Sequence, residues 1–270
     1  MKFTVLMSVY KGDKPDFLCE ALESLRIQTL VASEIVLVID GPIADELYQV
    51  ILDYKILLPL KIIKLKKNRG LAYALNKGLR FVSHEIIFRF DSDDVCAFDR
   101  FERQLNFFLE NNCDLLGSQI YEFDVSAADC SRLRVVPCDE SEIYARAKWR
   151  NPFNHMSVVY KKSRILQVGG YPSILFMEDY ALWIKLISNG CRVKNMTDTL
   201  VFVRAGESLI RRRSGFKYIF SEFLLQRLMY RIRFVGLIEA LLHFLIRSSL
   251  FILPYVLKKI IYLKFLRKLN

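Results

Sequence analysis

The stretch Ile-Ile-Phe-Arg-Phe-Asp-Ser-Asp-Asp occupies residues 86–94. Its first half is rich in β-branched and aromatic residues, which is typical of a buried strand, and three carboxylates follow within four positions. Those carboxylates must lie at the carboxyl end of the strand, where open α/β sheets bind ligands. They could hold a divalent cation that bridges the phosphates of a ligand. Alternatively, they only turn the chain and cap a helix that begins near Ala97.

Strands and helices alternate upstream of this stretch, which predicts a parallel, doubly wound sheet covered on both faces. The predicted strands span residues 3–9, 34–39 and 61–65, and the predicted helices span 16–28, 44–54 and 71–81.

Polar residues gather where these strands end, as Ser8, Val9 and Tyr10 close the first strand and Asp40 closes the second. Asp40 is either a turn former before Gly-Pro or an acceptor for the hydroxyls or base of a nucleotide. Arg69, ahead of the third helix, is either a surface cation or a clamp for an anionic group. Their common sheet edge favours a nucleotide site.

The second half of the chain offers a further acidic pair. We expect a helix over 98–110, a strand over 115–118, a loop over 124–139, and a strand over 156–160 with His155 at its amino end. The sequence at 169–172 is Gly-Gly-Tyr-Pro, which predicts a mobile loop. Glu178 and Asp179 then precede a helix over 181–188, and the helix dipole favours negative charge there. Capping explains one carboxylate, so the other could act as a general base.

Charge and hydropathy set the last quarter of the chain apart. The 270 residues are 53% hydrophobic and carry a net charge of +11. Residues 201–270 hold 14 Lys and Arg against 3 Asp and Glu, which accounts for the whole excess. A basic segment rich in Leu, Ile and Phe points to an anionic membrane surface first, and nucleic-acid binding is the second interpretation. The sequence also has no zinc-finger or RRM signature.

The pattern over 216–251 is helical and strongly apolar, and it lacks an uncharged window of about 18 residues, so helices lying in the membrane interface fit better than a spanning helix. Alternatively, these helices pack on the sheet domain or dimerise. A polar stripe is predicted at Arg227, Arg231, Glu239, His243 and Arg247. Cations for lipid headgroups are predicted at Lys258, Lys259, Lys264, Arg267 and Lys268.

The six cysteines are scattered without a C-x-x-C pair, which favours reduced thiols in a cytosolic protein. The apolar run near the amino terminus is too short for the core of a secretory signal.

Seven short motifs, taken in order, resemble those of the family 2 glycosyltransferases with a GT-A fold. They are Ser8-Val9-Tyr10, Asp40-Gly41, the run Asn-Arg-Gly-Leu-Ala at 68–72, Asp91-Ser92-Asp93-Asp94, Asn151-Pro152 with His155, Gly169-Gly170-Tyr171, and Glu178-Asp179-Tyr180 with Trp183. The resemblance covers residues 3 to about 205. Within the family, the sequence is similar in particular to bacterial enzymes that assemble O-antigen, capsule or exopolysaccharide, of the amylovoran type. It implies a GT-A, Rossmann-like domain over 1–205 and a helical membrane-associating segment over 206–270.

The resemblance also implies roles for residues. Ser8, Val9, Tyr10, Asp40 and Arg69 would bind the base and ribose of the donor, with Ser92 in the diphosphate site. Asp93, supported by Asp91, would contact Mn²⁺ or Mg²⁺, whereas the share of Asp94 is open. Asp179 would be the base that deprotonates the acceptor hydroxyl, and Glu178 is its neighbour. His155 and Trp183 are weaker candidates for contact with the diphosphate or acceptor.

The resemblance therefore implies a metal-dependent, inverting transferase. Its donor would be a nucleotide sugar, with a UDP-sugar favoured, and its acceptor a lipid-linked or growing glycan at the cytoplasmic face of the membrane. The sequence around Gln226-Arg227-Leu228 lacks the Q-x-x-R-W motif of processive members, which favours transfer of a single sugar. An inactive membrane-bound scaffold and a nucleotidyltransferase remain alternatives, and no nucleic-acid partner is expected.

Overall fold

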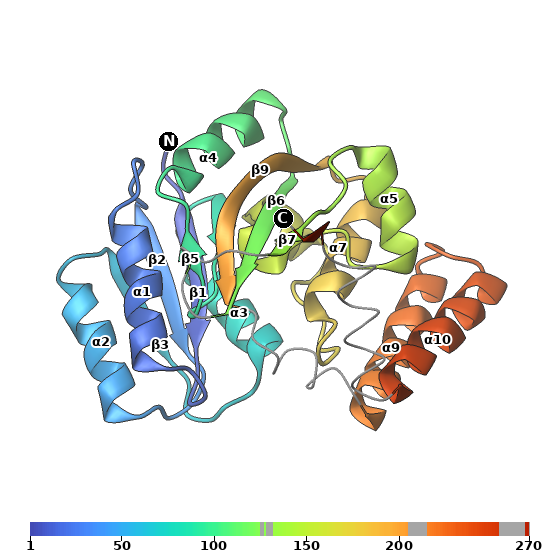
Figure 1. The fold of residues 1–270 in the computed structure, drawn as a ribbon, viewed down its shortest axis with the longest axis horizontal. Helices are drawn as coiled ribbons and strands as arrows, with labels where there is room; N and C mark the ends of the chain where they lie inside the picture. The colour runs from blue at the N-terminus through green and yellow to red at the C-terminus, as the bar shows by residue number, and fades with distance from the viewer. Residues whose placement is uncertain (125–126, 128–131, 205–214, 254–267, 270) are drawn as a thin grey trace.

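A 10-stranded mixed sheet with helices on both faces forms the body of the protein (Figure 1). The computed structural model describes residues 1–124, 127, 132–204, 215–253 and 268–269. In chain order, the elements are β1 (Thr4–Val9), α1 (Pro15–Arg26), β2 (Glu34–Ile39), α2 (Asp45–Lys55), β3 (Leu60–Lys64), α3 (Leu71–Leu79), β4 (Ile86–Arg89), β5 (Val95–Cys96), α4 (Arg100–Glu110), β6 (Leu115–Phe123), β7 (Arg132–Arg134), α5 (Glu140–Trp149), the 3₁₀ helix η2 (His155–Ser157), β8 (Val159–Lys161), α6 (Lys162–Gln167), α7 (Glu178–Ser188), β9 (Val193–Arg204), α9 (Phe216–Arg231), α10 (Leu237–Ile252) and β10 (Lys268–Leu269).

The first four strands of the doubly wound half lie in the order β3-β2-β1-β4 and are parallel. Beyond β4 the sheet changes direction, because β8 pairs antiparallel with β4 and β6 pairs antiparallel with β8. The long strand β9 runs parallel to β6 and curls over the sheet toward β5 (Figure 1). The predicted α/β fold with a doubly wound, mostly parallel sheet is confirmed.

Two buried clusters hold helices to opposite faces of this sheet. One joins α1, α2 and α4 to the strands through residues such as Leu22, Ile51 and Phe101. The other joins α3 and α7 to the opposite face through residues such as Leu75 and Leu182. Strands covered on both faces need nearly continuous apolar sequence, which the six buried residues of β2 provide.

Gly78 lets α3 lie close to the sheet. A Cβ atom built at this position would be 2.5 Å from Cδ1 of Leu6 on β1 and 2.9 Å from Cγ2 of Val38 on β2. Any side chain there would therefore push the helix away from the strands, and α3 carries the loop that faces the site described below.

Several elements differ from the sequence predictions. The helix expected from residue 98 begins at Arg100, and part of the expected loop over 124–139 forms β7 and the start of the pairing with β6. Residues 125–126 and 128–131 of that loop lie outside the described residues. His155 begins a 3₁₀ turn rather than a strand, since β8 starts only at Val159. The short strands β7 and β8 take their conformation from their partners in the sheet, which local sequence does not reveal.

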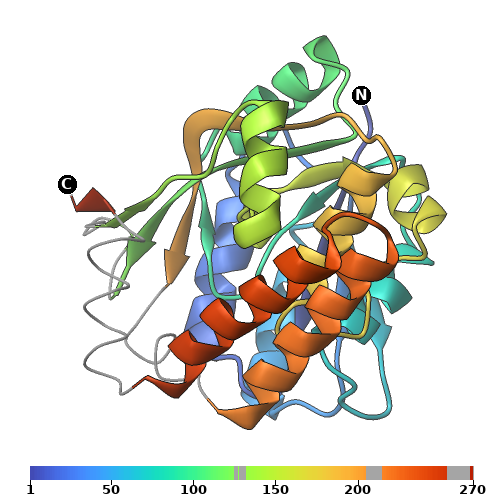
Figure 2. The ribbon, with the colours of Figure 1, turned by 90° about the vertical axis from the view of Figure 1, so that its right-hand side faces the viewer.

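The carboxyl-terminal segment forms two helices, α9 and α10, which lie side by side on one flank of the molecule (Figure 2). The helical pattern breaks after Arg231, where Arg233 has a φ of 58°. The predicted polar stripe is therefore wrong: Arg227 and Arg231 are exposed on α9, whereas His243 is buried on α10. Among the described residues, no helix is both long and apolar enough to cross a membrane. Of the predicted headgroup cations, Lys258, Lys259, Lys264 and Arg267 lie outside the described residues.

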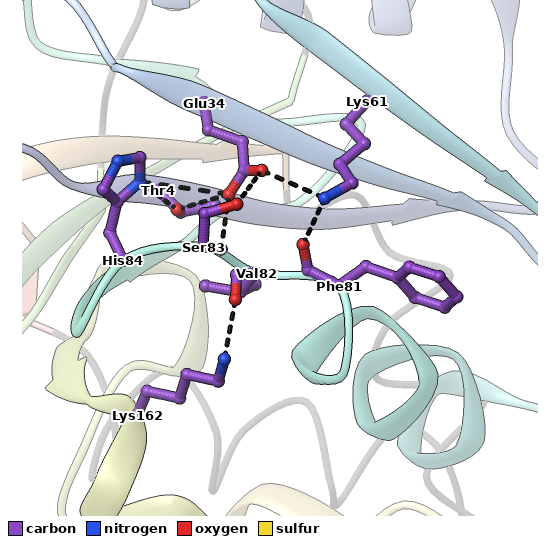
Figure 3. A network of polar contacts seen from close by, with 8 residues as sticks. All are labelled: Thr4, Glu34, Lys61, Phe81, Val82, Ser83, His84 and Lys162. Atoms are coloured by element: carbon purple, nitrogen blue, oxygen red, sulfur yellow. Dashed lines mark hydrogen bonds and ion pairs between the residues drawn. The ribbon is translucent and has the colours of Figure 1, made fainter.

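A polar network ties the strands together at the edge opposite the candidate site (Figure 3). The Glu34 carboxylate, at the start of β2, accepts hydrogen bonds from the Thr4 hydroxyl, the Ser83 hydroxyl and the Ser83 backbone N–H, each at 2.8 Å. The Lys61 ammonium lies 3.4 Å from the same carboxylate and donates to the Phe81 carbonyl at 2.7 Å. The network fixes the turn between α3 and β4, and so the start of the strand that ends in the acidic stretch.

Candidate active site

The carboxyl ends of β1, β2 and β4 meet at one edge of the sheet. Because β1 pairs in parallel with β2 and β4, the loops that begin at Tyr10, Asp40 and Asp91 all leave the sheet on this side. These loops carry most of the residues predicted to bind the donor. Ser8 is half-buried near the end of β1 and Val9 is buried, whereas the Tyr10 side chain is 43% exposed.

Asp40 is buried and holds the loop in front of α3. Its carboxylate accepts the backbone N–H groups of Arg69 and Gly70, both at 2.8 Å, and its carbonyl oxygen accepts the Asn68 amide at 3.1 Å. Gly41 permits this approach: its φ is +88°, and a Cβ atom there would lie 2.4 Å from the Asn68 backbone nitrogen. A ligand hydroxyl could bind Asp40 only in addition to these bonds, which two carboxylate oxygens can accommodate.

Arg69 is exposed beside this loop. Its guanidinium stacks over the Tyr73 ring at 4.1 Å, one turn into α3. The stacking holds the guanidinium beside the carboxyl ends of the strands and leaves its positive charge unneutralised. Arg69 is therefore placed to meet an anionic group.

Four carboxylates gather beyond β1 and β4, belonging to Asp13, Asp91, Asp93 and Asp94. Asp13 comes from the loop after β1, and its Oδ2 accepts the Tyr10 backbone N–H at 3.0 Å and the Ser92 hydroxyl at 2.9 Å. Burial and then the charges of Asp91 and Asp13 raise the pKa of Asp93 to about 6. Burial also raises the pKa of Asp13. Such mutual repulsion is relieved by a bound cation or by protons.

Arg89 supplies a buried positive charge beneath these acids. Its side chain is fully buried at the end of β4, where it pairs with the Asp91 carboxylate and donates to the Phe90 carbonyl. Its charge helps to lower the pKa of His155, after burial, to well below the usual value. His155 is therefore neutral at pH 7, and its Nε2 lies 3.2 Å from the Tyr171 hydroxyl.

Asp94 points into the protein and is not a helix cap. Its Oδ1 accepts the Arg204 backbone N–H at 3.1 Å, and α4 begins after Asp99 instead. Burial, followed by the charges of Asp93 and Asp91, raises the pKa of Asp94 well above its usual value. Asp94 thus joins the end of β9 to the acidic stretch, in surroundings that favour its protonated form.

The second acidic pair lies at the amino end of α7 and faces the same cluster. Asp179 Oδ2 accepts the Asn151 side-chain amide at 2.6 Å. Burial and then the charge of Asp179 raise the pKa of Glu178 to about 7, and the charges of Arg89 and Asp91 also act on Glu178. The end of β4 and the start of α7, far apart in sequence, therefore form one electrostatic unit.

Trp183 is fully buried and packs edge-to-face on Phe153 at 5.7 Å, and its contact with the diphosphate or acceptor stays a prediction. One predicted feature of this region is corrected. The loop at 169–172 is fixed rather than mobile. Tyr171 is buried, its N–H donates to the Asn76 side-chain oxygen, and its carbonyl accepts the Asn76 amide, both at 2.8 Å.

The acidic cluster is suited to sharing a cation with a ligand. Within the described part of the chain, no group of three or more His, Cys, Asp or Glu side chains is arranged to hold a metal alone. Mg²⁺ is commonly held by one or two carboxylates together with the phosphates of a substrate. Asp91 and Asp93 lie together at the sheet edge, where the charge of Asp91 helps to raise the pKa of Asp93, and they fit that second mode.

Comparison with known sequences identifies the family. Residues 4–171 match the family described as glycosyl transferase family 2. The chain belongs to this family. It is 41% identical to the amylovoran biosynthesis glycosyltransferase AmsE of Erwinia amylovora, over 97% of this chain and 98% of the relative. It is 37% identical to the UDP-Gal:alpha-D-GlcNAc-diphosphoundecaprenol beta-1,3-galactosyltransferase of Escherichia coli, over 99% of this chain and 97% of the relative.

Solved structures share the fold of this family 2 chain. Residues 1–349 of S. aureus TarS in complex with UDP-GlcNAc superpose with a TM-score of 0.70 at 20% identity, and the match covers 93% of this chain and 74% of that 1–349 chain. The mannosyltransferase PcManGT from Pyrobaculum calidifontis, in complex with GDP-Man and Mn2+, superposes with a TM-score of 0.64 at 17% identity. The match covers 95% of this chain and 77% of that chain.

Sequence reasoning missed two members of this family 2 site. Asp13 follows β1 in a loop of Lys, Gly and Asp, so only its position at a strand end pointed to the site. Arg89 stands inside an apolar strand, where an isolated charge is unusual and signals a buried pair. Both signals are present in the sequence, but neither shows which partner each residue meets.

Proposed function

We propose that this protein transfers one sugar from a nucleotide-sugar donor, with UDP-sugars favoured, to a hydroxyl of a lipid-linked acceptor during assembly of a bacterial surface polysaccharide. Its family membership supports sugar transfer. The observation that carries the finer proposal is that Arg89, paired with Asp91 at the end of β4, and Asp91 itself both act on Glu178, the neighbour of Asp179. The proposed diphosphate site and the proposed base would therefore lie at the same edge of the sheet.

The donor would lie along the carboxyl ends of β1, β2 and β4. Tyr10, with Ser8 and Val9 behind it, and the loop held by Asp40 would contact the base and ribose, and Arg69 would face an anionic group of the donor. Asp93 and Asp91 would hold Mn²⁺ or Mg²⁺ with the diphosphate. When bound, such a cation offsets the negative charge that develops on the departing diphosphate.

Asp179 would act as the general base. It takes the proton from the acceptor hydroxyl while the acceptor oxygen bonds to C1 of the sugar and the bond from C1 to the diphosphate oxygen breaks. The nucleoside diphosphate leaves with that bond's electron pair, so a single displacement inverts the configuration at C1. The Asn151 amide, bonded to Oδ2, keeps the carboxylate oriented. His155, neutral and close to Arg89, would contact the diphosphate or the acceptor.

A panel of nucleotide sugars tests this proposal, with a synthetic lipid-diphosphate sugar as acceptor and released nucleoside diphosphate as readout. We expect one donor to be used, and Asp179→Asn to lower kcat by about 10²- to 10⁴-fold. Asp198→Asn, at a surface ion pair with Arg103, is the matched control and should keep full activity.

Three further measurements separate the alternatives. Pyrophosphate release from a nucleoside triphosphate would identify a nucleotidyltransferase instead. Absence of stabilisation by any nucleoside diphosphate with Mn²⁺ would identify an inactive scaffold. NMR of the product's anomeric proton tests inversion, and an unchanged configuration at C1 would contradict a single displacement.

The outer face of α10 supports attachment to the cytoplasmic face of the membrane. Ile238 and Leu245 are 75% and 63% exposed, and Leu241, Leu242 and Ile246 continue the same apolar surface. Exposed Arg227 and Arg231 on the neighbouring helix add positive charge near it. An apolar face bordered by cations is the pattern of helices that lie in an anionic interface. A lipid-linked acceptor would then be concentrated at the enzyme.

A further inference from the structure

The helices α9 and α10 pack against the segment that carries Asp179. Their buried residues, including Leu225 and Met229 of α9, form one cluster with Met177, Tyr180 and Ala181 around the start of α7. Figures 1 and 2 show the two helices lying beside α7 on the flank away from α1 and α2. The pair is therefore part of the surroundings of the proposed base, not a separate appendage.

Arg247 of α10 reaches the residues that orient Asp179. Its Nη1 donates to the Trp149 carbonyl at 2.6 Å, two residues before the Asn151 amide that donates to Asp179. Its guanidinium also lies 5.2 Å from the centroid of the Tyr180 ring, the residue after Asp179. One side chain thus contacts both segments whose meeting sets the geometry of the carboxylate.

Glu222 of α9 holds Arg247 in place. Glu222 is fully buried, its Oε1 lies 2.8 Å from Arg247 Nε, and the Gln226 amide donates to the same oxygen at 2.8 Å. A buried ion pair contributes little net stability compared with apolar packing, yet removal of one partner leaves a costly unpaired charge. The pair therefore fixes where the arginine points.

Tyr218 of α9 holds the other side of the α7 start. Its ring stacks on Phe176 with centroids 4.0 Å apart and an interplanar angle of 4°. Phe176 lies two residues before Glu178 and has a φ of 65°. An aromatic residue adopts this left-handed conformation only where its surroundings stabilise it. The stacking supplies such support immediately before the acidic pair.

We propose that Arg247, Glu222 and Tyr218 are positioning residues for Asp179, so that the α9–α10 pair sets the geometry of the base while its outer face meets the membrane. This inference rests on the proposed role of Asp179. Arg247 acts from the Asn151 side of the carboxylate, and Tyr218 acts from the Phe176 side.

Steady-state kinetics on the full-length protein test the proposal, with Arg247→Met and Tyr218→Leu as the variants. We expect kcat to fall about 10- to 100-fold, because small displacements of a reacting group have effects of this size. The KM for the donor should stay unchanged, since neither residue belongs to the donor-binding loops. Arg247→Lys should recover part of kcat, because an ammonium can still donate to the Trp149 carbonyl.

Lys148→Gln is the matched control. Lys148 also joins α5 to α10, through a 3.5 Å ion pair with Glu239, but the two side chains are partly exposed, unlike the buried pair of Glu222 and Arg247. Its loss should leave kcat unchanged. An equal loss of kcat in this control would show that any weakening of the helix pair suffices, and it would overturn the specific role of Arg247.

A double variant distinguishes positioning from general stability. In an Asp179→Asn background, Arg247→Met should cause no further loss of the residual rate, because the group that it positions is already absent. A multiplied loss would overturn the proposal, as would an unchanged kcat in Arg247→Met alone. Failure of the unaltered protein to transfer sugar from any donor would instead overturn the proposed function itself.

Discussion

Asp94 is a buried acid whose protonated form its surroundings favour. Because its pKa is raised in the folded state, its contribution to stability is full below the unfolded pKa of about 4 and is lost as pH rises. Asp94→Asn keeps an oxygen to accept the Arg204 N–H and cannot ionise. We therefore expect the variant's free energy of unfolding to rise relative to the wild type as pH increases above about 4.

Denaturant unfolding at several pH values measures this difference. Asp94→Ala, which leaves the Arg204 N–H without its acceptor, should be less stable than Asp94→Asn by roughly 1–3 kcal/mol at every pH. A difference between Asp94→Asn and the wild type that does not change with pH would contradict a protonated Asp94.

Asp93 should link donor binding to a divalent cation. We expect a nucleoside diphosphate with Mn²⁺ to raise the wild-type Tm by roughly 5 °C at about a hundred times Kd, and a chelator to remove the increase. Asp93→Asn should abolish the increase, whereas Asp99→Asn, a surface acid beside Arg103, should retain it. A shift that survives the chelator would mean that the donor binds without metal.

At the scale of single residues, the sequence was sufficient to predict that the principal acids of the site lie close together. Asp91 and Asp93 stand at a strand end, Asp179 starts a helix, and strand order alone puts such positions at one edge. The inward turn of Asp94 and the burial of Trp183 were not predictable, because each depends on a partner more than a hundred residues away or on packing between helices. A one-residue offset in a loop decides whether a side chain faces the ligand or the core.

At the scale of elements, the Glu34 network makes the opposite edge pH-sensitive in the other direction. Burial opposes ionisation of Glu34, but hydrogen bonds from Ser83 and Thr4 and the charge of Lys61 outweigh it and lower the pKa. Its stabilisation is therefore present above the unfolded pKa of about 4.3 and is lost as pH falls through the folded pKa.

Glu34→Gln should lower the free energy of unfolding by roughly 1–3 kcal/mol at pH 7, because donors around the carboxylate lose their acceptor. The difference should shrink when both proteins are compared near pH 3. Glu46→Gln, in the first turn of α2, is a surface control. Equal destabilisation of Glu34→Gln at pH 3 and pH 7 would point to packing rather than charge.

Elements with a clear period were predicted closely. The strands β1 and β2 and the helix α1 end within two residues of their predicted bounds, since a continuous apolar run or a helical apolar pattern is local. The strand β9 was not predicted. Its Lys, Asn, Thr and Asp residues interrupt the apolar pattern, and only pairing with β6 and β5 makes it a strand.

At the scale of the whole molecule, the exposed face of α10 fixes how the protein would approach a bilayer. We expect the pair Leu241→Ser and Leu245→Ser to weaken binding to anionic vesicles by about tenfold or more, at roughly 1 kcal/mol for each half-buried leucine. Co-sedimentation with vesicles containing phosphatidylglycerol measures the change.

Ile56→Ser is the control, because Ile56 is 88% exposed after α2, on the flank opposite α10 (Figure 1). Binding that is unchanged in the double variant would contradict attachment through α10. Substitutions are preferable to removal of both helices, which would uncover Met177 and Tyr180 at the start of α7.

The bonds from Asp40 to the 68–70 loop have a kinetic consequence. The loop is already ordered before a donor arrives, so binding need not wait for the chain to fold around the nucleotide. Association should then proceed at a similar rate for related nucleotide sugars, and discrimination among them should reside in how slowly the correct one dissociates. Stopped-flow measurements would read this selectivity from residence times.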